Sequence, residues 1–549
     1  MRNLKFVRLS SLVLIFGLAA FLIGCQGIQP LPPGGTGGGT GGGTGGGGTT
    51  PAPTASITAT PDSVNQGQAV TLTWTTTNAT SVTIDGGIGT VAVNGTQQVT
   101  PTATVTYTLA ATGAGGTQDA TVKVTVLAPA PTSLQSINHI IFMLQENRSL
   151  DSYLGNLPQY WQSLGMANPP QFDGLPLNAS NPSFDGTTTI PVFHLKSVCF
   201  SDLSPSWNES HEDWSLGHGT SPTPMMNGFA TTAAKYARSN GNDDIEGTRA
   251  MGYYTWDDLN FYYDMATKFA TSDRWFSPVM SRTPPNRQYL IAATSAGHVY
   301  PSGPLTNKTI FQALEEAGVS WRVYESDPNS SYLRGFQPFA DQHATKIVSA
   351  DQFAQDAASG NLPAVAMIDG GYASGRDEHP NNNVQTGAAY VASFVKALMS
   401  SPSWKDSAFI LTFDEGGGVY DHVPPQPALN PEGCNDTTTT ACHPIDLKPG
   451  DTCSNPGTNC SFNYTGFRIP LIVISPFSKQ NYVSHTVADN TAILKLIESR
   501  FGLQALTLRD AAQMDMTEFF SFPDPAPWAT PPTPVDQKTG TLCNFDQLQ

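Results

Sequence analysis

The sequence predicts two domains of different class, a small all-β sandwich followed by a large α/β domain with a mainly parallel central sheet. In residues 54–128, Thr, Val and Ile alternate in short segments separated by turn sequences such as DGG and VNG, which is the pattern of a sandwich. From Ser136 onward, continuous apolar runs alternate with segments of helical spacing, as in a sheet buried on both faces. The 549 residues suffice for several domains with sizeable cores.

Residues 1–25 are predicted to be a lipoprotein signal peptide. A basic start precedes the apolar run 12–23, which is too short for a comfortable membrane span. The run ends in LIGC, which resembles a bacterial lipobox, with Cys25 as the lipidated residue; an ordinary secretory signal is the alternative. Gln26 after it resembles an outer-membrane address. We therefore expect an exported, membrane-anchored bacterial lipoprotein at the outer membrane, the cell surface or the periplasm.

Residues 26–53 are rich in Gly, Thr and Pro and are predicted to be a flexible tether. They are not a phosphate-binding loop, because the Lys-Ser/Thr pair and the flanking strand and helix of that motif are missing. Trp74 is expected in the core of the sandwich that follows. This segment resembles bacterial Ig-like domains and lacks the paired cysteines of antibody domains. We expect a spacer, with binding of carbohydrate or other surface components as the alternative.

In the α/β domain the runs INHIIFML, AVAMI, FILTF and IPLIVIS are expected to be buried strands of a parallel sheet. YVASFVKALM and NTAILKLIESRFG have helical spacing, and Gly502 is a plausible C-cap of the second helix. Sheets of this kind place their binding sites beyond the carboxyl ends of the strands.

Composition excludes some functions and predicts disulfides. The net charge of -17 and the pI near 4.9 argue against a nucleic-acid partner. An anionic substrate stays possible, because a bound cation reverses the local field. Without Cys25, six cysteines remain in a chain expected to be exported, which suggests disulfides; a zinc cluster is less favoured because no CxxC occurs. The pairing we expect, among 15 connectivities, is Cys434 with Cys442, Cys453 with Cys460, and Cys199 with Cys543.

Four oxygen-bearing side chains follow two predicted strands directly. Glu146 and Asn147 come after IIFMLQ, and Asp414 and Glu415 come after FILTF. Because parallel strands end at the same edge of a sheet, these side chains are expected to meet. Hard divalent cations prefer such all-oxygen ligand sets, and the glycines after Glu415 allow the backbone to pass close to the site. A solvated loop after a strand is the alternative.

A third segment, SRTPPNR, is predicted to begin a helix with Thr283 at the N-cap and Pro284 at N1. A helix N-terminus also attracts anions, and a Thr hydroxyl beside a cation could attack phosphorus. Asn286 and Arg287 are expected to hold phosphoryl oxygens as substrate-binding residues.

Five motifs occur in a fixed order, namely QENRSLDSYLG, SRTPPNR, DEHP, FDEGGGVYDHVPP and RIPLIVISPF with the helix after it. Together they resemble the bacterial phosphoesterase family of phosphatidylcholine-type phospholipases C and acid phosphatases, which have an alkaline-phosphatase-like fold. The resemblance covers about residues 136–525 and leaves 526–549 as a tail. It implies hydrolysis of a phosphate ester, including phospholipid as a candidate substrate.

The resemblance also implies roles for single residues. Thr283 corresponds to the nucleophile, which also faces the metal, with Ser281 as the runner-up. His211 and His379 correspond to histidines near the substrate phosphate and are the other catalytic candidates. His422 either contacts substrate or braces the metal loop through Asp421. The metal ligands implied are Glu146, Asn147, Thr283, Asp414 and Glu415, and the cation is Ca, Mg, Mn or Zn.

The chain departs from the family at Pro205, where many members carry a His. It also ends soon after the shared core, which favours a general phosphatase or phosphodiesterase. Two rivals stay open: another hydrolase of the same superfamily, such as a sulfatase or phosphotransferase, although no CxPxR-type sulfatase motif occurs, and a non-catalytic surface-binding lipoprotein.

Overall fold

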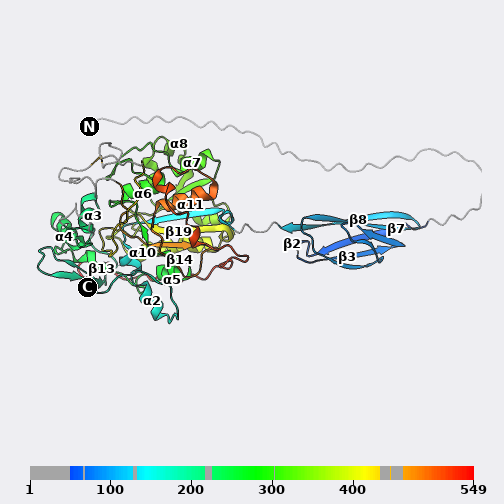
Figure 1. Ribbon diagram of the computed structural model, residues 1–549, viewed down its shortest axis with the longest axis horizontal. Coiled ribbons are helices and arrows are strands. Elements are labelled where there is room, and N and C mark those ends of the chain that lie inside the picture. Colours follow the sequence, from blue (N-terminus) through cyan, green and yellow to red (C-terminus); the bar gives the residue numbers. More distant parts are fainter. Residues whose placement is uncertain are drawn as a thin grey trace, which may run out of the picture. The chain divides into compact units, whose positions relative to one another are not determined.

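A computed structural model describes residues 50–65, 68–127, 133–216, 225–301, 303–432, 445–446 and 462–549 (Figure 1). The chain forms two compact units divided near residue 130. The predicted signal peptide, residues 26–49 of the tether and the cysteines at 25, 434, 442, 453 and 460 lie outside the described residues. No helix among the described residues is long and apolar enough to cross a membrane.

The first unit consists of two sheets around one core. The strands β1 (Thr54–Thr60), β3 (Val70–Thr77) and β6 (Gly95–Val99) form one antiparallel sheet. The other has the order β2 (Ser63–Asn65), β8 (Gly116–Leu127), β7 (Val105–Gly113), β4 (Ser81–Ile84) and β5 (Gly89–Val91), antiparallel except for the parallel β2–β8 pair.

Side chains alternate between the core and solvent along β3, as the sequence pattern predicts for a half-buried strand. Trp74 is buried in the shared core, and its Nε1 donates to the carbonyl of Ala92 at 2.9 Å. The all-β prediction and the place of Trp74 are therefore confirmed. The resemblance to Ig-like domains stays a prediction.

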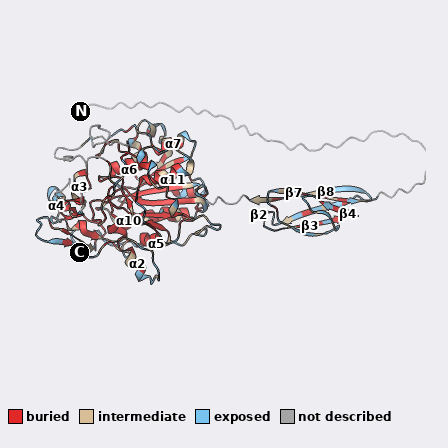
Figure 2. Cartoon of the chain, in the orientation of Figure 1, coloured by how far each residue is buried: buried red, intermediate tan, exposed pale blue. Residues whose placement is uncertain are grey.

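The second unit is built on an eight-stranded sheet. Its order is β17 (Ile347–Ser349), β16 (Trp321–Glu325), β18 (Val365–Asp369), β9 (His139–Gln145), β19 (Ser407–Phe413), β20 (Leu471–Ile474), β14 (Ala270–Ser272) and β21 (Tyr482–Ser484). The first five strands are parallel, which confirms a mainly parallel sheet. Strands β9, β18 and β19 are buried along their whole length apart from the first residue of β9 (Figure 2).

The direction expected for one strand is wrong. The run IPLIVIS contains β20, which is fully buried but antiparallel to both of its neighbours. A strand buried on both faces is apolar whichever way it runs, so its composition cannot report its direction.

Helices cover both faces of this sheet. Helices α6, α7 and α11 lie above strands β19 and β14 in Figure 1, and α5 lies below them. Helix α10 contacts α5 and α9. Helix α11 ends at Gly502 in the left-handed conformation, as predicted. The helices are α1 (Leu150–Leu154), α2 (Leu157–Ser163), α3 (Trp207–Trp214), α4 (Phe229–Asn240), α5 (Asn260–Lys268), α6 (Thr283–Ala292), α7 (Ile310–Glu316), α8 (Phe339–Gln342), α9 (Gln352–Ala358), α10 (Val384–Met399), α11 (Thr491–Phe501) and α12 (Leu508–Ala511).

The described part of this unit also contains three two-stranded pairs: β10 (Ser180–Pro182) with β11 (Thr189–Pro191), β12 (Phe193–His194) with β13 (Gly252–Tyr253), and β15 (Trp275–Phe276) with β22 (Ala488–Asp489). Residues 526–549 contain no helix or strand. A disulfide joins Cys543 in this tail to Cys199, which confirms one expected pair. The tail also bonds to the body, since the backbone N–H of Asn544 donates to Ser197 Oγ at 2.8 Å.

Candidate active site

The site begins where β9 and β19 end side by side. The register pairs Gln145 with Phe413, so the next residues of the two strands, Glu146 and Asp414, lie next to each other. The N–H of Asn147 and Oδ1 of Asp414 are 3.2 Å apart in a hydrogen bond that ties the two loops together. The expected meeting of these side chains at one edge of the sheet is confirmed.

The loop after β19 requires glycine. Gly417 has φ +70°, and a Cβ atom there would lie 2.3 Å from the carbonyl oxygen of Asn147. Its N–H donates to Oε2 of Glu415 at 2.6 Å. The second oxygen of Glu415, Oε1, is buried without a hydrogen-bond partner among the described residues. A side chain at residue 417 would push this loop away from Asn147 and disturb the position of Glu415.

Thr283 faces the same strand ends from the first turn of α6. Its Oγ1 lies 2.9 Å from Oε2 of Glu146 and 3.2 Å from Oδ1 of Asn147. The expectation that Thr283 is the N-cap is off by one residue, because Arg282 is the N-cap and Thr283 is the first helical residue. The Thr283 hydroxyl is therefore free of a capping role and is directed at the site.

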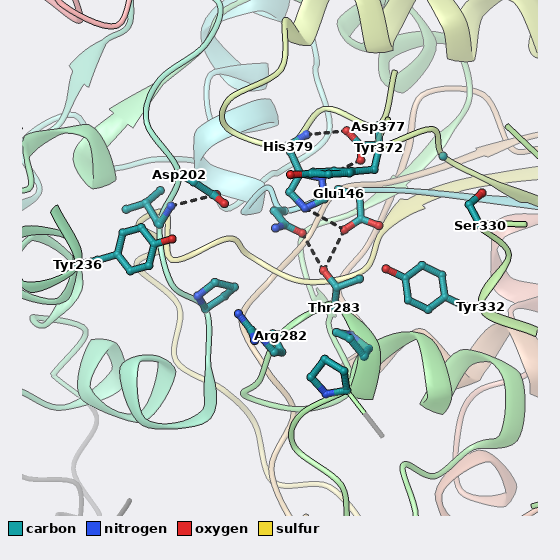
Figure 3. A pocket seen from close by; sticks show the side chains of 16 residues that line it. Glu146, Asp202, Tyr236, Arg282, Thr283, Ser330, Tyr332, Tyr372, Asp377 and His379 are labelled. Atoms are coloured by element: carbon teal, nitrogen blue, oxygen red, sulfur yellow. Dashed lines mark hydrogen bonds and ion pairs between the residues drawn. The ribbon is translucent and has the colours of Figure 1, made fainter. Parts of the chain in front are cut away.

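These residues line a cavity of about 420 Å³ (Figure 3). Thr283, Glu146 and His379 meet on one side of it, and Arg282, Tyr236 and Asp202 lie around the other side. The full lining is Glu146, Asn147, Asp202, Leu203, Pro205, Tyr236, Arg282, Thr283, Pro284, Pro301, Ser330, Tyr332, Gly370, Tyr372, Asp377 and His379.

His379 is held in the cavity by a carboxylate. Its Nδ1 lies 2.7 Å from Oδ2 of Asp377, and its Nε2 lies 3.6 Å from Oε2 of Glu146. Burial works against the charged imidazole, but the carboxylates of Glu146, Asp377 and Asp414 outweigh it and raise the pKa of His379 to about 9. The ring is therefore protonated near neutral pH in this arrangement.

Arg287 does not reach the cavity. It lies one helical turn beyond Thr283 on α6, and its guanidinium pairs with Oε1 of Glu146 at 2.6 Å, with Asp369 at 3.3 Å and with Asp414 at 3.5 Å. The expectation that Arg287 holds phosphoryl oxygens is corrected, because its guanidinium is paired with these carboxylates outside the cavity lining. The guanidinium neutralises the carboxylates of Glu146, Asp369 and Asp414, whose negative charge burial would otherwise disfavour.

Asn286 and Ser281 also point away from the cavity. Oδ1 of Asn286 accepts from the N–H of Val279 at 2.9 Å, and its Nδ2 donates to the Ser281 carbonyl at 2.8 Å. The Ser281 hydroxyl donates to the carbonyl of Val299 at 2.8 Å. Asn286 thus stabilises the turn before α6 instead of contacting substrate, and Ser281 is not placed to compete with Thr283.

His211 is buried outside the cavity lining. On α3, its Nδ1–H donates to the carbonyl of Trp207 at 2.6 Å, and the two rings are in contact, with centroids 4.4 Å apart. Burial lowers the pKa of His211 to about 4, so the ring is neutral at pH 7. The geometry gives no support to the catalytic role expected for His211.

His422 lies in a separate buried ion-pair cluster. Its Nδ1 is 2.7 Å from Asp151 and its Nε2 is 3.2 Å from Asp173. Asp151, Asp421 and His422 could in principle hold a cation. Arg468 already occupies this cluster, pairing with Asp151 at 2.8 Å and Asp421 at 2.9 Å. The expected substrate contact of His422 is corrected, and the bracing expected through Asp421 runs instead through the bonds of His422 to Asp151 and Asp173.

The predicted metal ligands fit a hard cation by their chemistry. Burial raises the pKa of Glu146 to about 8, with Arg287 lowering it and Asp414 raising it again. Burial and Asp414 likewise raise the pKa of Glu415 well above its usual value. A divalent cation would offset the negative charge of these carboxylates and would give the unpartnered Oε1 of Glu415 a partner. Every predicted ligand atom is an oxygen, as hard cations prefer.

Several residues of the cavity carry no signal that sequence reasoning used. Asp202, Tyr236, Tyr332 and Tyr372 come from loops and helices far apart in the chain. Tyr372 is 59% exposed and packs its ring edge against His379, with centroids 4.8 Å apart. Arg282 belongs to the motif SRTPPNR and directly precedes Thr283. This position is the signal from which its place in the cavity could have been predicted.

The comparisons with known proteins bear on the same segment. Residues 137–504 match the model of the Phosphoesterase family. Phospholipase C B of Mycobacterium tuberculosis is 30% identical over 455 residues, covering 74% of this chain and 80% of that protein. Non-specific phospholipase C1 of Arabidopsis thaliana is 29% identical over 422 residues, covering 71% and 72%. Among solved structures, an alkaline phosphatase superfamily protein from Vibrio parahaemolyticus is 13% identical, covering 66% and 78%, with a TM-score of 0.30.

The large unit is thus an α/β domain that gathers carboxylates and an amide at the ends of β9 and β19, with the Thr283 hydroxyl facing them from the start of α6. The chain belongs to the Phosphoesterase family, and it is a hydrolase that acts on phosphoric ester bonds.

Proposed function

We propose that this protein hydrolyses its phosphate ester through attack of the Thr283 hydroxyl on phosphorus, in a site that holds one divalent cation. The single observation that carries the proposal is the position of Thr283 Oγ1, in the cavity and within 2.9 Å of Glu146 and 3.2 Å of Asn147. A hydroxyl that only capped a helix would have no reason to lie against those two side chains.

In the first half of the reaction, Thr283 Oγ1 forms a bond to phosphorus and the bond to the leaving oxygen breaks. The hydroxyl proton is directed at Oε2 of Glu146, which accepts it. Nε2 of His379 faces the same space and gives its proton to the leaving alcohol. A divalent cation held by Glu146, Asn147, Thr283, Asp414 and Glu415 would lower the pKa of the hydroxyl and offset phosphoryl charge.

In the second half, water attacks phosphorus and gives a proton to Nε2 of His379. The bond between phosphorus and Thr283 Oγ1 breaks, and that oxygen regains its proton from Glu146. Inorganic phosphate or a phosphomonoester leaves, depending on whether the substrate is a monoester or a diester. Both curated relatives described above are named phospholipases C, which makes a phospholipid one substrate to test.

The decisive experiment is rapid quenching of the wild type with ³²P-labelled substrate, followed by mapping of the labelled peptide. We expect phosphate on Thr283. Thr283→Ala should fold normally and lose turnover by at least about a thousandfold, because the attacking atom is gone. Thr283→Ser is the matched control, because it keeps the hydroxyl and should stay measurably active. Near-wild-type turnover of Thr283→Ala would show that the covalent mechanism is wrong.

We also propose that Cys25 carries a lipid anchor on an exported chain. The motif LIGC supports this, and so does the Cys199–Cys543 disulfide, because such bonds persist in oxidising compartments. Cys25→Ser should lose labelling by a palmitate analogue and should leave the membrane fraction. Retained labelling and retained membrane association would contradict the anchor without touching the proposed chemistry.

A further inference from the structure

Arg282 and Thr283 are consecutive residues whose side chains line the same cavity (Figure 3). This is unusual for neighbours within a helix, which point about 100° apart. It occurs here because the helix starts between them. Arg282 has an extended backbone, with φ −76° and ψ 177°, and Thr283 is the first residue of α6. The guanidinium and the hydroxyl therefore approach one space from the same end of α6.

The other cationic side chains at the site already have carboxylate partners. Arg287 pairs with Glu146, Asp369 and Asp414, and it does not line the cavity. His379 lines the cavity but is bonded through Nδ1 to Asp377. Arg282 forms no ion pair with a carboxylate in the part of the chain that the structure describes. Its guanidinium lies 5.8 Å from the ring centroid of Tyr300 instead.

Arg282 is thus a half-buried cation without an ion-pair partner among the described residues. Losing water without gaining a counter-charge is unfavourable for an ion, so a ligand that supplies the counter-charge is favoured. A guanidinium presents its N–H donors in a planar fork that fits two oxygens of a phosphate group. The aromatic face of Tyr300 limits where the side chain can lie without using those donors.

We propose that Arg282 binds the non-bridging oxygens of the substrate's phosphoryl group and thereby favours esters whose phosphoryl group carries two negative charges. The attraction between the guanidinium and the phosphoryl group is proportional to the product of their charges. A monoester dianion therefore gains more from Arg282 than a diester with a single charge. This inference rests on the proposed function, because it places the phosphoryl group at Thr283.

The first test measures binding without turnover. Calorimetric titration of inorganic phosphate into the full chain, with the same divalent cation in every sample, compares wild type, Arg282→Gln and Arg282→Lys. We expect Arg282→Gln to weaken phosphate binding about ten- to a hundredfold, the loss of one charge-assisted hydrogen-bonded contact. Arg282→Lys should recover part of the affinity, because it keeps the charge but not the fork.

Arg238→Gln is the matched control. Arg238 pairs with Glu246 on the surface, with 39% and 50% of the two side chains exposed, and it does not line the cavity. It should bind phosphate as the wild type does, because exposed ion pairs contribute little.

The second test compares kcat/KM for p-nitrophenyl phosphate and for bis-p-nitrophenyl phosphate. Arg282→Gln should lose more on the monoester than on the diester, by about tenfold in the ratio. Equal losses on both esters would overturn the inference, and so would wild-type phosphate affinity in Arg282→Gln. Failure of Thr283→Ala to lose turnover is a separate outcome, since it concerns the attacking atom and leaves the phosphate titration unaffected.

Discussion

Oδ2 of Asp377 lies 2.7 Å from Nδ1 of His379, and this contact fixes the direction in which the imidazole faces the cavity. The other oxygen of Asp377 accepts from the backbone N–H of His379 at 3.2 Å and from Asn382 at 2.8 Å. The carboxylate is therefore itself held in place. With Nδ1 occupied, Nε2 is the nitrogen left to exchange a proton with substrate.

Asp377→Asn should lower kcat by about a hundredfold, at the low end of what a general acid contributes. An amide keeps the shape but no longer stabilises the protonated ring. KM should change much less, because Asp377 acts through His379. The kinetic pKa of the acid should fall in the variant, which a pH profile of kcat measures. An unchanged pH profile with unchanged kcat would contradict the positioning role.

The neighbouring Glu378 predicts a pH dependence of stability. Its buried carboxylate accepts from Tyr262, from Tyr153 at 2.8 Å and from Gln145 at 3.0 Å. Burial raises its pKa from 4.5 to about 7, although these donors work in the opposite direction. Because the folded-state pKa is raised, the stabilisation is fully present below pH 4.5 and is lost as the pH rises through about 7.

Glu378→Gln removes this ionisation. The wild type should therefore lose about 3 kcal/mol of unfolding free energy relative to the variant between pH 4.5 and pH 8. Urea unfolding at several pH values measures the difference, and titrations elsewhere in the chain cancel in the comparison. Parallel stability curves for the two proteins would show that Glu378 does not titrate in this range.

His211 is expected to matter for folding and not for turnover. His211→Gln should lower the unfolding free energy by about 1–3 kcal/mol, because it disturbs a buried hydrogen bond to Trp207 and the ring contact with it. At saturating substrate its kcat should stay within about threefold of the wild type, a difference below 1 kcal/mol in the barrier. A hundredfold loss of kcat in a stably folded His211→Gln protein would restore the catalytic role that the sequence suggested.

The metal is tested at Asp414. Asp414→Asn should lose both bound cation and activity, because a neutral amide replaces an anionic ligand in a site for a hard cation. Metal content after dialysis, measured by mass spectrometry, is the readout. Thr283→Ala serves as the comparison, since it keeps all four ligands from the two strand ends and should retain metal. Full metal content in Asp414→Asn would remove this residue from the ligand set.

The sequence predicted what local pattern and chain order determine. Apolar runs predicted the buried strands. Polar residues that directly follow parallel strands lie at one edge of the sheet, and for this reason the proximity of Glu146 and Asp414 was predicted correctly. The start of α6 was predicted to within one residue from Thr283 and the prolines that follow it. These predictions concern the backbone or residues within one position of the end of a helix or strand.

Side-chain direction was not predictable in the same way. Asn286, Arg287 and His422 each belong to a motif that lies at the site. Arg287 and His422 turn toward partners distant in sequence, whereas Asn286 turns back to the turn just before α6. Arg287 lies 141 residues from Glu146 along the chain, and His422 lies 271 residues from Asp151. Motif spacing specifies which residues are near a site but not which carboxylate captures a cationic side chain. Asp202 from a loop and Tyr236 from α4 likewise enter the cavity only through tertiary packing.

The pairing of β9 with β18 and β19 has a consequence for how activity appears during folding. Thr283 is 137 residues from Glu146, and Asn147 is 267 residues from Asp414. Contacts of such high sequence separation close large loops and form slowly. No fragment of the sheet contains the complete set of reacting groups. After dilution from denaturant, hydrolytic activity should therefore recover more slowly than the far-UV circular dichroism signal. The rate at which activity returns would then report the rate of the last long-range strand pairing.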